Sequence, residues 1–121
     1  PIPKKLAKAG CKDIVRISDG RMSGTAFGTI VLHVTPESAL GGPLAYVQNG
    51  DRIRLSLANR ELSLLISDQE LAQRQAAQPV KVPTAERGYQ KLFLESVLQA
   101  DKGADFDFLM PQSKSIIPKF E

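Results

Sequence analysis

The sequence predicts a mixed α and β domain, with a strand-rich first part that forms a β-barrel or sandwich and with helices toward the C-terminus. Two observations lead to this fold class: strand patterns gather before residue 67, and the longer helical patterns come after it. Regular alternation of strands and helices is missing, which argues against a βαβ sheet. A length of 121 residues, with 42% hydrophobic and 24% charged residues, suits one soluble domain.

The first third of the chain predicts a short helix and two strands joined by a polar loop. Residues 4–9 lie between a proline and a glycine, as helices often do. Residues 13–18 and 28–34 are rich in β-branched side chains. The second of these strands is almost continuously apolar, so we expect it to be covered on both faces and His33 to be a satisfied core histidine. The loop between the strands spans residues 18–25.

The middle of the chain predicts a hairpin. Residues 52–67 alternate apolar and polar side chains on either side of Asn59 and Arg60, which mark the turn. Arg52 and Arg54 on its polar face, with Glu61 across the turn, are expected to be solvated cross-strand charges. The short apolar run at residues 44–47 is interpreted as part of a further strand pair.

The last part predicts two helices. Residues 67–70 match a capping box, so a helix is expected from there to about Ala77. A second helix, capped by Thr84, is expected over residues 85–100, with Gly103 beyond its end. Its core-facing stripe consists of Tyr89, Phe93 and Val97.

Composition excludes several functional classes. The net charge of +3 comes from basic residues spread among acidic ones, and aromatics make up 6%, a pattern that does not predict nucleic-acid binding. No apolar stretch has the length of a membrane span, and the chain lacks a signal-peptide pattern. Cys11 alone can form neither an internal disulfide nor a metal cluster, so we expect a buried or half-buried thiol without a role and a reducing, cytoplasmic compartment. Because the chain starts with proline, we expect an excised fragment or a processed chain.

The loop at residues 18–25 is chemically the richest segment. It combines two glycines, one arginine, one carboxylate and several hydroxyls. Gly20 and Gly24 permit unusual backbone angles and close approach of a ligand, and Arg21 has the shape to bind a carboxylate through two hydrogen bonds. The simpler alternative is an ordinary turn between strands.

A serine hydrolase is the first enzyme class to test against this loop, because Ser23 lies among glycines. The nucleophile elbow of such enzymes reads Gly-x-Ser-x-Gly, and the spacing from Gly20 to Gly24 does not match it. The chain also holds a single histidine, His33, in its most apolar strand. A self-contained catalytic triad is therefore not expected.

Four ordered motifs carry a resemblance to a known family. Residues 15–28 read Val-Arg-Ile-Ser-Asp-Gly-Arg-Met-Ser-Gly-Thr-Ala-Phe-Gly, and characteristic pieces follow at 32–37, 41–45 and 49–53. Together they resemble the dihydroxyacid and phosphogluconate dehydratase family, also called the IlvD/EDD family. Met22, with residues 26–27 and 98–109, is most similar to the branch that acts on arabinonate, xylonate and galactonate, whereas the sequence beyond Leu109 departs from that branch.

The resemblance implies that this chain is a single C-terminal domain, residues 1–121, of a larger dehydratase. The family fold of this part is a swivelling β/β/α domain, which has a β-barrel-like core with flanking helices. The missing N-terminal domain would hold a [2Fe–2S] cluster and Mg²⁺, and would be the partner of this domain. The full-length enzyme is expected to be a homo-oligomer, and this fragment alone is expected to be inactive.

The family reaction removes water from a 2,3-dihydroxy acid to give a 2-keto-3-deoxy acid. The resemblance places the base that takes the proton from carbon 2 on Ser23. Arg21 and Thr25 are expected to help place either Ser23 or the substrate, and are assigned to substrate binding. The cluster iron would act on the leaving hydroxyl and Mg²⁺ on the carboxylate. Two alternatives remain open: a dihydroxyacid dehydratase of branched-chain amino-acid synthesis, and a non-catalytic barrel that binds a small acid or a protein.

Overall fold

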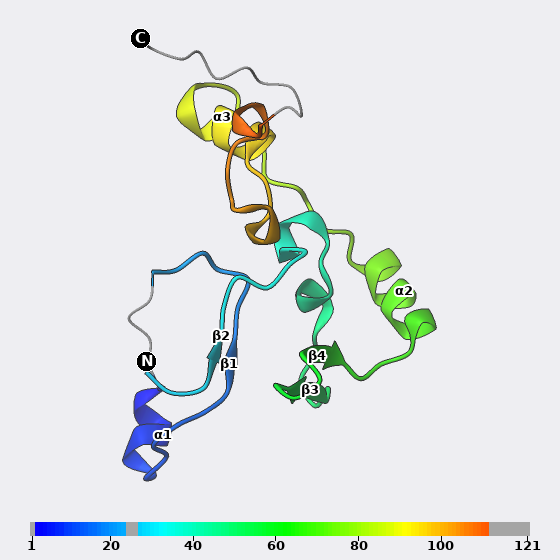
Figure 1. The fold of residues 1–121 in the computed structure, drawn as a ribbon. Helices are drawn as coiled ribbons and strands as arrows, with labels where there is room; N and C mark the ends of the chain where they lie inside the picture. Colours follow the sequence, from blue (N-terminus) through cyan, green and yellow to red (C-terminus); the bar gives the residue numbers. More distant parts are fainter. Residues whose placement is uncertain (1, 24–26, 112–121) are drawn as a thin grey trace. The chain divides into compact units, whose positions relative to one another are not determined.

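The computed structural model describes residues 2–23 and 27–111 (Figure 1). They belong to two compact units, Pro1–Val82 and Pro83–Glu121. The first unit contains all the strands and most of the residues singled out by the sequence. The second contains one α-helix with short helical turns. Mixed α and β character is confirmed within these ranges.

The first unit begins with helix α1, Lys4–Lys8, and a small parallel sheet. Strand β1, Arg16–Ile17, pairs with β2, Ile30–Val31, in a register that sets Arg16 opposite Ile30. The two strands run side by side in Figure 1. Both lie where the sequence predicts strands, but they are shorter than expected, because only a few backbone hydrogen bonds join them.

The predicted hairpin is confirmed. Strand β3, Ile53–Ser56, pairs antiparallel with β4, Glu61–Leu64. Nη1 of Arg54 lies 3.6 Å from Oε1 of Glu61 across the pair, as the alternation predicts. In the described ranges the two sheets are separate and contain two strands each, and they do not close into a barrel.

Residues 44–47 do not form the expected strand. They lie instead in a 3₁₀ helix, η2, which spans Pro43–Tyr46 and follows another, η1, at Ser38–Leu40. Pro43 occupies the first position of η2, where its fixed φ angle and missing N–H favour a helical turn. Gly42, which precedes it, is buried so closely that a Cβ would overlap the carbonyl oxygen of Pro36.

Helix α2, Asp68–Ala77, begins as the capping box predicts. The hydroxyl of Ser67 accepts a hydrogen bond of 3.1 Å from the backbone N–H of Glu70, a cap that stabilises a helix by about 1 kcal/mol. The Glu70 carboxylate does not complete the box. It accepts a bond of 2.5 Å from Arg74, one turn further along the helix.

Arg74 ties α2 to the turn before β3. Its guanidinium donates to both carboxylate oxygens of Asp51, at 2.5 and 3.0 Å, and to the carbonyl oxygen of Tyr46 at 2.9 Å. The side chains of Arg74 and Asp51 are 12% and 10% exposed, so this bidentate pair is largely shielded from water. Tyr46, which is 7% exposed, is the one buried hydrophobic side chain in the described ranges.

The second unit contains helix α3, Gly88–Ser96, and two 3₁₀ turns, η3 at Ala100–Lys102 and η4 at Asp107–Leu109. The sequence places this helix correctly, but too long at both ends. It starts after an uncapped Arg87 rather than at Thr84, and it ends because Val97 turns extended and bridges to Phe106. Gly103, at φ +86°, ends η3 instead of α3.

The expected apolar stripe of α3 is only partly covered. The rings of Tyr89 and Phe93 each lie 6.3 Å from the ring of Phe106, measured between centroids. Tyr89 is nevertheless 70% exposed. No helix in the part of the chain described here is long and apolar enough to cross a membrane.

The Arg74–Asp51 pair generates a prediction about acid stability. Hydrogen bonds from Arg74, and then from the backbone N–H of Gln48, lower the pKa of Asp51 from its ordinary 3.8 to about 2. A lowered carboxyl pKa stabilises the folded state above the unfolded pKa, and this contribution disappears as the pH falls toward the folded pKa. We therefore expect Asp51→Asn to destabilise the chain at pH 5 and above, with a difference from wild type that shrinks between pH 4 and 2.

Urea unfolding of the chain and of the variant across this pH range measures the effect. Asp101→Asn is the matched control, because it removes an exposed carboxylate that contacts only its neighbour Lys102 among the ion pairs of the described residues. Asp101→Asn should lower the free energy of unfolding by less than Asp51→Asn does. A difference between Asp51→Asn and wild type that stayed constant from pH 5 to pH 2.5 would contradict the assignment.

Candidate functional site

The loop that carries Ser23 connects two parallel strands. Two neighbouring parallel strands cannot be joined by a tight turn, because the chain has to return to the starting end of the first strand before the second strand can begin. Between β1 and β2 this return is made by residues 18–29, and those of them that the structure describes, 18–23 and 27–29, form no helix. Ser23 lies near the middle of the connection and is exposed, as is Met22. Thr25, predicted to contact substrate, and Gly24 lie outside the described residues.

The first half of this loop is folded by its own polar groups. The hydroxyl of Ser18 accepts a hydrogen bond of 2.9 Å from the backbone N–H of Gly20. Gly20 permits an unusual backbone angle, but its φ angle is not positive. The bond to Ser18 accounts for the turn instead, and a Cβ at position 20 would lie 3.1 Å from that same hydroxyl oxygen.

His33 is not the core histidine that the sequence predicts. It follows β2, is exposed, and has a φ angle of +56° in the left-handed region. Its backbone N–H donates to the carbonyl oxygen of Gly20 at 3.4 Å, and its ring Nε2 lies 3.1 Å from the carbonyl oxygen of Met22. The apolar run misled the prediction because β2 ends at Val31, so His33 lies outside the strand that was expected to include it.

Two acidic residues make further contacts between the loop and the segment after β2. Nε of Arg21 donates to Oε1 of Glu37 at 2.7 Å, and these side chains are 23% and 20% exposed. Oδ2 of Asp19 accepts a bond of 2.6 Å from the backbone N–H of Ser38. Hydrogen bonds from the side chain and then the backbone of Ser38 lower the pKa of Asp19, so it is ionised at neutral pH.

The far end of the loop is held by Asp13 and Arg16. Oδ2 of Asp13 accepts from the backbone N–H and the hydroxyl of Thr29, at 2.9 and 3.0 Å, and these bonds lower the pKa of Asp13. Nη2 of Arg16 donates to the carbonyl oxygen of Phe27 at 2.5 Å. Gly28 fits between them at φ +94°, where a Cβ would clash with the Asp13 carboxylate.

Ser23 therefore lies between two anchored ends. No hydrogen bond joins its hydroxyl to another described residue, and the Nε2 atom of His33 is engaged with Met22. The described residues thus provide no serine–histidine pair. Sequence reasoning found Ser23 and Arg21 but missed Asp13, Arg16 and Glu37. A usable signal was the set of charged residues that flanks the glycine-rich loop on both sides.

The described ranges do not fit a metal or cluster site. They contain no group of three or more histidine, cysteine, aspartate or glutamate side chains that could hold a metal ion. Cys11 is half-buried, as predicted, and its Sγ atom lies 3.2 Å from the carbonyl oxygen of Asp13. A [2Fe–2S] cluster needs several such ligands.

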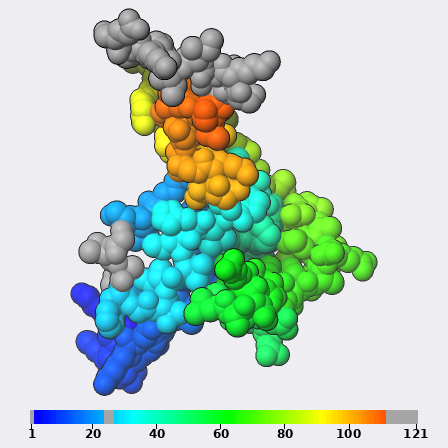
Figure 2. All heavy atoms as spheres, viewed as in Figure 1, coloured from blue at the N-terminus to red at the C-terminus, as the bar shows by residue number. Residues whose placement is uncertain are grey.

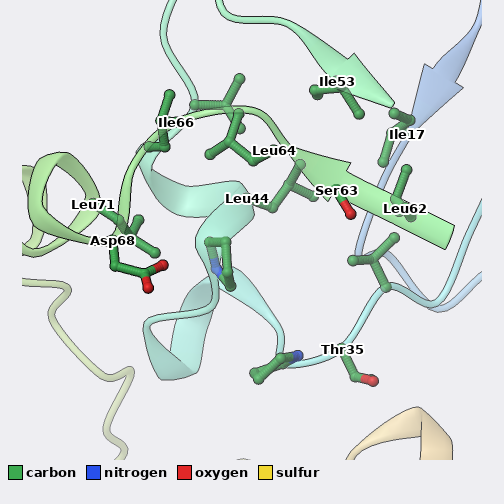
Figure 3. A pocket seen from close by; sticks show the side chains of 14 residues that line it. Ile17, Thr35, Leu44, Ile53, Leu62, Ser63, Leu64, Ile66, Asp68 and Leu71 are labelled. Atoms are coloured by element: carbon green, nitrogen blue, oxygen red, sulfur yellow. The ribbon is translucent and has the colours of Figure 1, made fainter. Parts of the chain in front are cut away.

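A separate apolar cavity of about 330 Å³ lies between the two sheets of the first unit (Figure 3). Side chains from β1, η2, β3, β4 and α2 point into it, and the lining includes Ile17, Leu44, Ile53, Leu62, Leu64 and Leu71. Figure 2 shows the cyan segment and the green hairpin that border it side by side. Residues 18–23 are not part of the lining, and its apolar character does not suit a sugar acid.

Comparison with known proteins gives several dehydratases. IlvD1 of Rhizobium meliloti (strain 1021), named as a dehydratase without a stated substrate, is 59% identical over 95% of this chain and 20% of its own length. The L-arabinonate dehydratase of Rhizobium leguminosarum bv. trifolii (strain WSM2304) is 55% identical over 89% of the chain and 19% of its own length. The 6-deoxy-6-sulfo-D-gluconate dehydratase of Pseudomonas putida is 49% identical over 98% and 20%. The chain thus spans about a fifth of these relatives.

Dihydroxy-acid dehydratases match less closely. That of Dehalococcoides mccartyi (strain CBDB1) is 42% identical over 78% of the chain and 17% of its own length. A family model described as the dihydroxy-acid/6-phosphogluconate dehydratase C-terminal region matches residues 1–104. The identities, their coverage and this match agree with the motifs around Ser23. This chain belongs to the dihydroxy-acid and 6-phosphogluconate dehydratase family and corresponds to its C-terminal region.

Proposed function

We propose that this chain is the C-terminal domain of a larger hydro-lyase that converts an aldonic acid to its 2-keto-3-deoxy acid, with Ser23 as the proton-abstracting base. The observation that carries the proposal is the placement of Ser23: it is exposed near the middle of a loop that is anchored on both sides. Membership of a dehydratase family supplies the reaction class.

In this reaction the bond from carbon 2 to hydrogen breaks, the hydroxyl on carbon 3 leaves as water, and the resulting enol becomes the 2-keto product. The Ser23 oxygen takes the proton from carbon 2. A serine hydroxyl is a poor base at neutral pH, so its environment must favour the alkoxide. No basic side chain among the described residues contacts Ser23. The groups that favour its alkoxide form are therefore proposed to lie in the rest of the polypeptide.

The roles of Arg21 and Thr25 follow from their nearness to Ser23 in sequence. Arg21 binds or orients the substrate carboxylate, and Thr25 contacts a substrate hydroxyl. The Nε atom of Arg21 is bonded to Glu37, which fixes this side chain two residues before the proposed base.

The cofactors are assigned to the remainder of the protein. We place a [2Fe–2S] cluster and Mg²⁺ on an N-terminal domain, because the described part of this chain offers no ligand set for either. The chain covers about a fifth of its relatives, which leaves ample length for such a domain. The complete enzyme is proposed to be a cytoplasmic homo-oligomer.

Exposed apolar surface supports the proposal that other parts of the enzyme cover this domain. Leu57 on the hairpin is 89% exposed and Phe27 on the loop is 88% exposed. The cavity between the sheets is also open to further apolar contacts. Large apolar side chains of this kind gain free energy when a partner removes them from water, at about 25 cal/mol per Å².

The aldonic-acid branch is favoured over a branched-chain dihydroxyacid dehydratase. Relatives named for sugar acids are 49–55% identical to the chain, compared with 42% for the dihydroxy-acid dehydratase described above. Met22, next to the proposed base, fits the same branch. The particular sugar acid is left open, since the relatives differ in the acid for which they are named.

Replacement of the proposed base tests the mechanism. In the full-length protein we expect Ser23→Ala to lower kcat by at least about 100-fold, because only the proton acceptor is lost. Thermal stability and iron content should match wild type, since the side chain is exposed. Ser96→Ala, at the end of α3, is the control and should keep full turnover. Dehydration by Ser23→Ala at close to the wild-type rate would refute the assignment of Ser23 as the base.

A substrate panel tests the branch. We expect full-length protein to dehydrate at least one of arabinonate, xylonate and galactonate with a kcat/KM well above that for a branched-chain 2,3-dihydroxy acid. Release of the 2-keto product measures both reactions. A preference for the branched-chain acid would instead place the protein with the dihydroxyacid dehydratases.

The isolated chain provides a further test. We expect the purified 121-residue polypeptide to show no dehydration of any substrate that the full-length protein accepts, because its described part has no ligand set for a metal. Assay of both proteins with added Mg²⁺ and iron makes the comparison. Turnover by the isolated chain would contradict the assignment of the cofactors to another domain.

A further inference from the structure

We infer that His33 and Glu37 are positioning residues, which hold the loop so that Ser23 meets the substrate in one fixed place. This inference rests on the proposed role of Ser23 as base. Neither residue contacts Ser23 itself in the described structure. Both act through the residues that come immediately before it.

The key observation is a continuous series of contacts. Each of the four residues that precede Ser23 is bonded to the segment from His33 to Ser38. Their partners are the backbone N–H of Ser38 for Asp19, the backbone N–H of His33 for Gly20, Glu37 for Arg21, and the ring of His33 for Met22. These contacts lie beyond the last pair of the parallel sheet; the bond between Gly20 and His33 joins backbone groups, and the other three involve a side chain.

His33 contributes to this series twice. A carbonyl oxygen can only accept, so Nε2 of the ring must carry a proton where it lies 3.1 Å from the Met22 oxygen. Its left-handed backbone, at φ +56°, costs a residue other than glycine some free energy. That conformation lets the backbone N–H of His33 bond to Gly20 while its ring bonds to Met22. These two contacts explain why the structure retains the strained φ angle of His33.

Glu37 fixes the neighbouring residue. Its Oε1 atom and the Nε atom of Arg21 lie 2.7 Å apart, and both side chains are about four-fifths buried. A charge-assisted bond in such surroundings is directional, so it restrains the rotamers of Arg21. Arg21 and Met22 are thus held from the same side, and Ser23 is the next residue.

Proton transfer from carbon is sensitive to this kind of restraint. A base displaced by about 1 Å can lose about 100-fold in rate, although substrate binding at other contacts is little changed. Loss of a positioning contact should therefore lower kcat more than it raises KM. A residue that only stabilised the fold would change the melting temperature and leave kcat of the folded fraction unchanged.

The experiment compares paired variants in the full-length protein. His33→Leu and Glu37→Leu remove the contacts, and we expect each to lower kcat about 10- to 100-fold with KM within about threefold. His33→Gln keeps a donor nitrogen at a similar reach, and Glu37→Gln keeps an oxygen that accepts from Arg21. Each Gln variant should recover at least about tenfold of the activity lost by its Leu counterpart.

Glu61→Leu is the matched control, because it breaks the ion pair with Arg54 in the same unit but on the hairpin. It should retain wild-type kcat. All variants are assayed well below their melting temperatures, which are measured in parallel. Wild-type kcat in both Leu variants, or equal losses in the Leu and Gln variants, would overturn the inference.

Ser23→Ala separates this inference from the proposed function. If Ser23→Ala is inactive while both Leu variants turn over normally, the base is correct and the positioning role is wrong. If Ser23→Ala keeps full activity, the proposed base is wrong, whatever the His33 and Glu37 variants do. A loss confined to KM in the Leu variants would also reject positioning of the base and point to substrate binding.

Discussion

The parallel pairing of β1 with β2 is the constraint on which the rest of the site depends. Only two residues of each strand form the ladder, yet their direction decides what the chain between them must do. An antiparallel pair would be closed by a short turn that carries little chemistry. A parallel pair forces a long return, and a long return without a helix needs side-chain contacts to fix its course. Asp13, Arg16 and Glu37 provide these contacts.

Strong local signals in the sequence predicted their elements well. The alternation around Asn59 and Arg60 gave the hairpin, and the Ser67 cap gave the start of α2, because both depend on neighbours within a few residues. The prediction failed for residues 44–47 and for His33, where apolar character suggested strands. At these positions the conformation is determined by Pro43 and by the end of the β1–β2 ladder. The hydrophobicity of the residues predicts neither of these two features.

The candidate site was likewise predicted only in part from the sequence. Ser23 and Arg21 could be found from the sequence, since their loop combines glycines, hydroxyls and charge in a family motif. The residues that hold the loop could not be ranked in this way, because Asp13 and Glu37 are distant in sequence from the atoms they bind. The barrel expected from the family is likewise not formed by two separate two-stranded sheets. A closed barrel requires strand pairings beyond those in the described residues.

The anchoring of the loop at both ends has a consequence for how such a site can change over time. The contacts fall on Asp19 to Met22 on one side and on Phe27 to Thr29 on the other, and the acceptors on Gly20, Met22 and Phe27 are backbone carbonyls that any residue would offer. Side chains such as Met22 and Phe27 are therefore free to vary without loosening the frame. Selection for a new acid substrate can therefore act on the exposed side chains of the loop, while the conformation of its backbone is kept.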